Sequence, residues 1–177
     1  MLTDEQLMME YKSGKAWAFE QLFGRYRNSI YGFFRRRLTD VARAEDLAQE
    51  TFIVILRGTE RYEAKAKFRT YLYAVALKVL WTERRKGLRE NRAREAVAEL
   101  SEESTNPVAS ICIRNALERL DPQHREVLML REYEQLPYDE IADVLKIPVN
   151  TVRSRIFRAR SELKALLETQ PAGEALR

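Results

Sequence analysis

The sequence contains almost no cysteine or histidine. A single cysteine, Cys112, excludes an intrachain disulfide framework and fits a reducing compartment. Together with the single histidine, His124, it cannot supply the ligands of a Cys/His zinc site. We also expect no Cys–His catalytic dyad, because His124 lies in a helix predicted to begin at Asp121-Pro122. These absences argue against a disulfide scaffold, a zinc protein and a thiol enzyme.

Long apolar runs are absent too. The longest, residues 71–77, is far too short to cross a bilayer. The first five residues are partly acidic and hold no apolar core, so we expect no signal peptide and a cytoplasmic protein. A hydrophobic content of 45% is enough for real cores, while 33% charged residues argue for a soluble chain.

The net charge of +4 is unevenly distributed. Residues 1–93 hold 19 basic and 12 acidic residues, a net charge of +7. Residues 94–110 have a net charge of −3, and residues 111–177 hold 11 of each sign. In this last part the arginines gather between positions 153 and 160. A basic first half and one basic segment in the second suggest that a polyanion is contacted at two places.

Hydrophobic periodicity is helical nearly throughout, without a convincing alternating strand or internal repeat. The predicted fold is therefore all-α, with two small helical domains joined by a flexible acidic linker. We place the first domain at residues 1–93, the linker at 94–110 and the second domain at 111–170, followed by a frayed tail at 171–177. The linker is assigned from its polar, acidic second half, which is unlikely to pack.

The segment from Asn150 to Arg160 is predicted to be an amphipathic helix with a basic front. Its apolar positions fall on one stripe, and Asn150 or Thr151 can cap its first turn. The side chains on the opposite face are Arg153, Ser154, Phe157 and Arg158. Guanidinium groups match phosphates and guanine edges. A solvated surface helix would alternate charges, and here no acid appears before Glu162.

A short apolar-faced helix is predicted just before this segment, over residues 137–146, and residues 147–149 then break it. A short helix, a tight break and a basic amphipathic helix form a helix-turn-helix, whose second helix enters the major groove. The usual turn glycine is missing, and Asn150 is the residue nearest to that role.

In the first half, the helix predicted over residues 44–57 has two different sides. The residues expected to face the core are Leu47, Thr51, Val54 and Ile55. Another side holds Asp46, Gln49 and Glu50 together, which suggests a protein-docking face. An acid in a first turn also favours the helix dipole, and this alternative accounts for Asp46 without any partner.

Residues 60–67 are predicted to form a loop that leads into a largely apolar helix over residues 68–86. Both ends of this helix are basic and aromatic. The cations concerned include Lys65, Lys67, Arg84 and Arg85. Interleaved aromatic and cationic side chains can stack splayed bases and hold the backbone of a single strand. Core aromatics with solvated cations would give the same pattern, so both interpretations remain open here.

Taken together, these stretches resemble the bacterial ECF-type (extracytoplasmic-function) sigma factors. Three segments carry the resemblance: residues 44–56, 68–86 and 120–163, the last including YDEIADVLKIPVNTVRSRIFRARSEL. The resemblance implies two helical domains that bind core RNA polymerase, at the clamp of its largest subunit and the flap of the second, and direct it to promoter DNA. It implies no catalytic residue, metal, cofactor or small-molecule substrate.

The resemblance also implies a role for individual residues. The helix that docks on the clamp corresponds to Asp46, Gln49 and Glu50. The loop that captures a flipped minus-ten base and its flanking helix correspond to Tyr62, Lys65, Lys67, Phe68, Tyr71 and Lys78. The readers of the minus-thirty-five element correspond to Arg153, Ser154, Phe157 and Arg158, and Arg131 corresponds to a phosphate contact. Many relatives have Trp, Asn and Asp in place of Tyr71, Lys78 and Thr82, so their minus-ten base preference does not carry over.

Two other functions were weighed against this one. A free-standing helix-turn-helix regulator would use only the second domain and would leave the basic first domain unexplained. A nuclease would need clustered carboxylates for metal ions; Asp46 and Glu50 lie one helical turn apart, but no third ligand is evident. ECF relatives often have an anti-sigma partner, frequently at the membrane, and the sequence neither requires nor excludes one.

Overall fold

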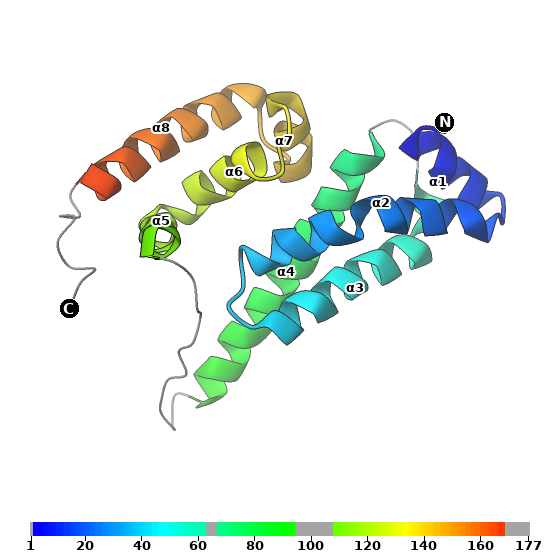
Figure 1. Ribbon diagram of the computed structural model, residues 1–177, viewed down its shortest axis with the longest axis horizontal. Coiled ribbons are helices and arrows are strands. Elements are labelled where there is room, and N and C mark those ends of the chain that lie inside the picture. Colours follow the sequence, from blue (N-terminus) through cyan, green and yellow to red (C-terminus); the bar gives the residue numbers. More distant parts are fainter. Residues whose placement is uncertain (1, 63–66, 95–107, 169–177) are drawn as a thin grey trace. The chain divides into compact units, whose positions relative to one another are not determined.

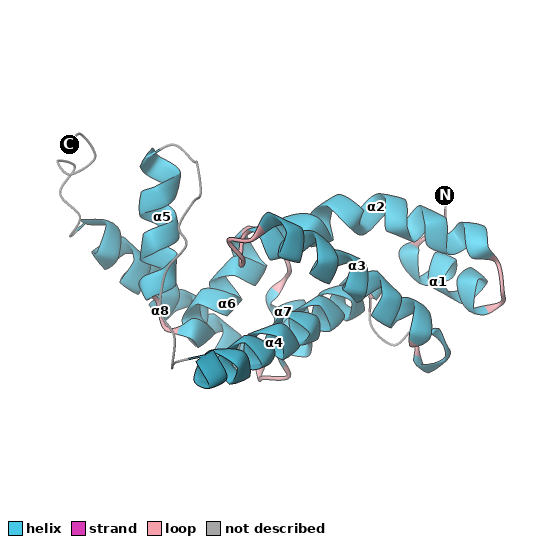
Figure 2. Cartoon of the chain, turned by 90° about the horizontal axis from the view of Figure 1, so that it is seen from below, coloured by secondary structure: helices cyan, strands magenta, loops and turns pink. Residues whose placement is uncertain are grey.

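The computed structural model describes residues 2–62, 67–94 and 108–168, and every regular element in these ranges is a helix (Figures 1 and 2). The all-α prediction is therefore confirmed. The chain divides into two compact units, Met1–Glu103 and Ser104–Arg177. No helix within the described ranges is long and apolar enough to span a membrane.

The described part of the first unit contains four α-helices and one short 3₁₀ helix. Their bounds are α1 Asp4–Lys12, α2 Ala16–Arg35, α3 Val41–Arg57, η1 Thr59–Arg61 and α4 Phe68–Arg94. Helix α2 packs between α1 and α3, α3 packs on α4, and α1 also contacts η1 and α4. The fully buried side chains come from all four α-helices and include Leu7, Leu22, Phe33, Ile55 and Leu77. Each such side chain stabilises the unit by roughly 1.5–3 kcal/mol.

Local sequence signals explain where these helices start and end. The Gln6 N–H donates to Oγ1 of Thr3, and the Thr3 N–H donates to Oε1 of Gln6, which forms a capping box at α1. Gly14, with a φ of +94°, turns the chain between α1 and α2. The Asp40 side chain accepts a hydrogen bond from the Arg43 N–H at the start of α3.

Between residues 108 and 168, the described part of the second unit, the chain forms four α-helices. Their bounds are α5 Val108–Arg119, α6 Pro122–Glu132, α7 Tyr138–Leu145 and α8 Val149–Glu168. Helix α8 contacts the other three. Asp121 caps α6 by accepting hydrogen bonds from the Gln123 and His124 N–H groups, and Pro122 occupies the first helical position as predicted. Buried apolar residues on α8 include Val152, Ile156 and Ala159.

The predicted linker was too long at both ends. Helix α4 continues to Arg94 and α5 begins at Val108, so helical residues occupy both ends of the segment 94–110. The rest of that segment, residues 95–107, and the predicted tail 171–177 lie outside the described residues.

Candidate nucleic-acid interface

The turn between α7 and α8 differs in detail from the sequence prediction. Asn150 is neither the cap nor the turn residue, because α8 already begins at Val149 and the Pro148 carbonyl accepts hydrogen bonds from the N–H groups of Thr151 (2.9 Å) and Val152 (3.1 Å). The fixed φ of proline suits the start of a helix. The left-handed position normally given to glycine is occupied by Lys146, with φ 55° and ψ 46°.

Helix α8 presents the predicted basic face to solvent. The side chains of Arg153, Ser154, Phe157 and Arg158 are all exposed. Phe157 is 73% exposed, the highest value among the exposed large hydrophobic residues. An aromatic side chain left this accessible is suited to apolar contact with a thymine methyl group. Within the described structure, Arg158 makes no ion pair, so its guanidinium is available to an external partner.

The arginines on α8 are not equally available for contact with DNA. Arg160 donates to the carboxylate of Glu132 on α6 at 2.7 Å, and this hydrogen bond raises the pKa of Arg160. Acids are missing from α8 before Glu162, as the sequence indicates, but Glu132 of the neighbouring helix α6 supplies one across the interface. Arg153 makes only a long contact of 3.4 Å with Oδ1 of Asn150.

Arg131, the predicted phosphate contact, is half-buried at the end of α6. Its guanidinium donates to the Leu136 carbonyl at 3.0 Å and lies 5.3 Å from the centre of the Tyr138 ring. Arg131 therefore connects the end of α6 to the start of α7, and its contact with a phosphate stays a prediction.

The residues predicted to contact the minus-ten element differ in how exposed their side chains are. Tyr62 and Phe68 are only 3% and 0% exposed, with ring centres 6.2 Å apart, so neither can stack on a base while it stays buried. Lys67, Lys78 and Arg85 are exposed, whereas Tyr71 and Arg84 are half-buried. Lys65 lies outside the described residues.

Tyr71 links the buried aromatic cluster to the surface. Its ring centre is 5.3 Å from that of Tyr62 and 6.4 Å from that of Phe68. Burial raises the pKa of the Tyr71 phenol above its ordinary value. Of the three aromatic residues, Tyr71 alone combines partial exposure with packing against the other two.

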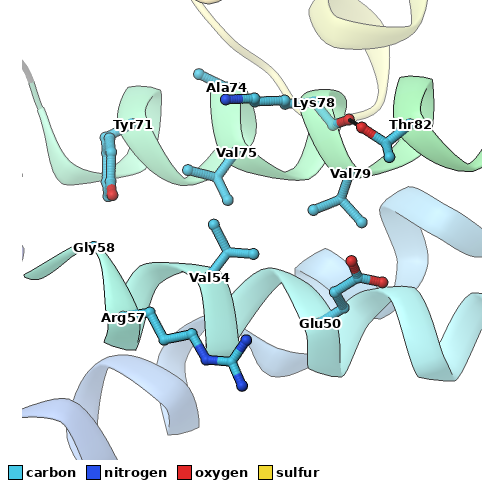
Figure 3. A pocket seen from close by; sticks show the side chains of 10 residues that line it. All are labelled: Glu50, Val54, Arg57, Gly58, Tyr71, Ala74, Val75, Lys78, Val79 and Thr82. Atoms are coloured by element: carbon cyan, nitrogen blue, oxygen red, sulfur yellow. Dashed lines mark hydrogen bonds between the residues drawn. The ribbon is translucent and has the colours of Figure 1, made fainter.

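Tyr71 also lines a groove of about 680 Å³ between α3 and α4. Val54 of α3 points across it toward Val75 and Val79 of α4 (Figure 3). The sequence prediction that Val54 belongs to the core is wrong, because this side chain is 38% exposed in the groove. Periodicity places Val54 on the same stripe as Leu47, but it does not show where two helices leave a gap.

The predicted docking residues on α3 do not form a single cluster. Glu50 lines the groove between α3 and α4, whereas Gln49 lines a second groove between α2 and α3 that also involves Phe23 and Tyr31. Asp46 has a side chain 64% exposed and lies 3.6 Å from Arg43. The three residues are accessible, but Gln49 and Glu50 line different grooves, because α2 and α4 pack on different sides of α3.

An ion pair that the sequence did not reveal fastens α4 to α3. Arg43 donates through Nε and one terminal nitrogen to the two carboxylate oxygens of Glu83, at 2.6 and 2.5 Å. This bidentate geometry lowers the pKa of Glu83. The two residues are 40 positions apart, so no local pattern could have paired them.

Comparisons with known proteins agree with this architecture. The profile of Sigma-70 region 2 matches residues 22–90, and that of Sigma-70, region 4 matches residues 110–163. The RNA polymerase sigma-H factor of Pseudomonas aeruginosa is 31% identical over 93% of this chain and 94% of its own length. The ECF RNA polymerase sigma-E factor of Haemophilus influenzae is also 31% identical, over 92% and 94%.

A solved structure has the same fold. The sigma factor RpoE in complex with the anti-sigma factor NepR, from Bartonella quintana, matches with a TM-score of 0.72 at 21% identity, covering 86% of this chain and 98% of that one. With both sigma-70 regions matched and two full-length relatives above 30% identity, the chain belongs to the ECF sigma factors of the sigma-70 family, which act in transcription initiation.

Proposed function

We propose that this sigma factor reads the minus-thirty-five element as duplex through α8 and holds the minus-ten element as a melted single strand on the first unit. The observation that carries the proposal is the face of α8, where Arg153, Phe157 and Arg158 are exposed on a helix whose other side is buried. A helix of this kind, preceded by a short helix and a tight turn, fits the major groove.

The first unit would bind the melted strand through side chains that surround the end of α4. Lys67 is an exposed cation four residues before the half-buried Tyr71, and Lys78 is an exposed cation that lines the same groove as Tyr71. Cations that follow the backbone and an aromatic ring that stacks a base are the usual combination for single strands. Binding energy released there would offset the unpairing of each extruded base, which costs a few kcal/mol.

Core polymerase would be engaged by both units. We assign the clamp of the largest subunit to the accessible part of α3 around Asp46, Gln49 and Glu50, where Gln49 and Glu50 line the two neighbouring grooves. The flap of the second subunit is assigned to the second unit. The factor itself would be non-catalytic and would act in the cytoplasm with the polymerase. An anti-sigma partner is a further proposal, supported by the similarity to RpoE, which was solved with NepR.

The experiment that tests the reading face begins with transcription from a promoter library by purified core polymerase and this factor. Arg158→Ala should weaken recognition of the selected minus-thirty-five element by about 1–3 kcal/mol, because a guanidinium contact to a base edge or phosphate is lost. Arg160→Ala is the matched control, since the Arg160 side chain is already paired with Glu132. Its exposed ion pair contributes only about 0–1 kcal/mol to stability.

Unchanged promoter selection by the Arg158→Ala variant would contradict the assignment of this face. Specific binding of the chain to duplex DNA without polymerase would favour a free-standing regulator instead. Metal-dependent cleavage of DNA by the pure protein would indicate an enzyme.

A further inference from the structure

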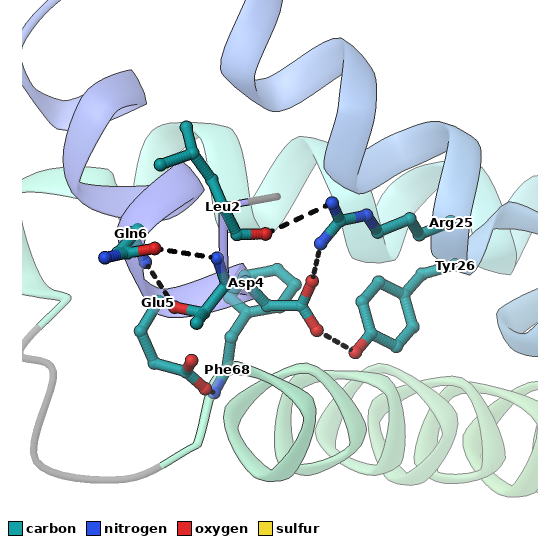
Figure 4. A network of polar contacts seen from close by, with 8 residues as sticks. Leu2, Asp4, Glu5, Gln6, Arg25, Tyr26 and Phe68 are labelled. Atoms are coloured by element: carbon teal, nitrogen blue, oxygen red, sulfur yellow. Dashed lines mark hydrogen bonds and ion pairs between the residues drawn. The ribbon is translucent and has the colours of Figure 1, made fainter.

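Helix α1 is firmly attached to the first unit. Leu7 and Met8 are fully buried. Asp4 pairs with Arg25 and accepts a hydrogen bond from the Tyr26 hydroxyl, both on α2 (Figure 4). Burial and this hydrogen bond raise the pKa of Tyr26. Helix α1 is therefore a rigid support for whatever its other side contacts.

That other side contacts both ends of the loop between Tyr62 and Phe68. Lys12 donates to the carbonyl oxygens of Glu60 (2.9 Å) and Tyr62 (3.3 Å), where the loop starts. Glu5 accepts a hydrogen bond from the Phe68 N–H at 2.9 Å, where the loop ends and α4 begins (Figure 4).

The spacing of Glu5 and Lys12 suits this arrangement. Seven residues are almost two full helical turns, so the two side chains leave the same side of α1, about 10 Å apart along its axis. The charges of the two side chains also suit the groups that they contact. The Lys12 ammonium group donates to carbonyl oxygens, and the Glu5 carboxylate accepts from the first N–H group of α4. A carboxylate is favoured at a helix N-terminus, and α4 has no acid in its own first turn.

We propose that α1 sets the positions of Tyr62 and Phe68, and that Glu5 and Lys12 are thereby positioning residues for capture of the melted strand at Tyr71. This inference rests on the proposed function, because it assigns a purpose to the contacts only if Tyr71 binds DNA. Neither residue touches the strand. They act by holding Tyr62 and Phe68, against which Tyr71 packs.

The test measures the affinity of the full holoenzyme for a single-stranded oligonucleotide carrying the minus-ten sequence that the wild-type factor selects. Glu5→Ala and Lys12→Met should each weaken binding about tenfold, the loss expected for one hydrogen bond to a charged group. Glu5→Gln keeps an acceptor oxygen and should restore most of the affinity. The matched controls are Glu10→Ala and Lys15→Met, which remove a different ion pair of α1 and should bind as the wild type does.

Affinity for core polymerase and the unfolding midpoint are measured on the same variants. Strand affinity equal to that of the wild type in Glu5→Ala and Lys12→Met would overturn the proposal. Equal losses of strand binding, core binding and stability would also overturn it, because α1 would then only support the fold. Two other results would contradict the proposed function itself. The wild-type holoenzyme would not bind the strand, or the Tyr71→Ala and Lys78→Ala variants would bind it as tightly as the wild type.

Discussion

At the scale of single residues, Tyr62 carries a hydroxyl group into the interior of the first unit. Among the described residues this hydroxyl has no hydrogen-bond partner, and the side chain is 3% exposed. Burial, with a smaller contribution from the charge of Glu5, raises the pKa of Tyr62 to about 12. A buried polar group without a partner costs about 1–3 kcal/mol, so the chain retains this hydroxyl at the expense of stability.

Removing the hydroxyl should therefore stabilise the protein. We expect Tyr62→Phe to raise the free energy of unfolding of the first unit by about 1 kcal/mol, because the ring contacts remain and the unsatisfied group is gone. Urea unfolding followed by tryptophan fluorescence is a suitable measurement, since both tryptophans, Trp17 and Trp81, lie in this unit. Tyr26→Phe is the control and should destabilise, because the Tyr26 hydroxyl donates to Asp4. A loss of stability in Tyr62→Phe would show that its hydroxyl has a partner.

At the scale of elements, α7 ends on a residue that is poorly suited to its backbone conformation. Lys146 adopts the left-handed conformation that costs a residue with a Cβ roughly 1–2 kcal/mol. The N–H group of the next residue, Ile147, donates back to the Ala142 carbonyl at 3.1 Å, and this bond closes α7 through the left-handed residue before Pro148. The sequence predicts the turn residue at Asn150 instead, because lysine, unlike glycine or asparagine, has no preference for the left-handed conformation.

Lys146→Gly should accordingly stabilise the helix-turn-helix by about 0.5–1 kcal/mol. Glycine removes the steric cost of the left-handed conformation, and the greater backbone entropy of glycine in the unfolded chain offsets part of that gain. Lys146→Ala keeps the steric cost while removing the charge, so it should change little. The measurement is urea unfolding followed through the NMR signals of the Val144 methyl groups, which belong to the second unit. An equal gain in both variants would attribute the effect to charge and contradict the backbone explanation.

At the scale of the whole molecule, the two units have separate cores, and the stability of the first should depend on pH through an ion pair of its own. In the first unit, pairing with Arg43 lowers the pKa of Glu83 below its ordinary value of 4.5. A carboxylate with a lowered folded pKa stabilises the protein above the unfolded pKa, and this stabilisation is lost as the pH falls through the folded pKa. Acid should therefore loosen the attachment of α4 to α3.

We expect Glu83→Gln to lower the stability of the first unit by about 1 kcal/mol at pH 7, since the pair is partly exposed and screened by solvent. The difference from the wild type should shrink as the pH is lowered from neutral to below 4.5, the ordinary glutamate value, because protonation removes the same interaction. Urea unfolding of both proteins, followed by tryptophan fluorescence at several pH values, measures this difference in the free energy of unfolding. A difference that stays constant over this range would show that the pair does not contribute through its charge.

Much of this protein was determined by the sequence alone, because the signals concerned are local. Periodicity and caps such as Thr3 and Asp121 predicted the helices, and one helical wheel predicted which face of α8 is exposed. These features depend on residues within about one or two turns of each other. They are therefore readable without knowing what packs against them.

Only the tertiary structure decided the rest, because it depends on groups that meet through space. Pairing of Arg160 with Glu132 removes one cation from the apparent basic face. Packing of α2 and α4 on either side of α3 separates Gln49 from Glu50 and leaves Val54 in an open groove. Whether a charged side chain is paired, or an apolar side chain is buried, depends on the residues packed against it. In these cases those residues belong to other helices.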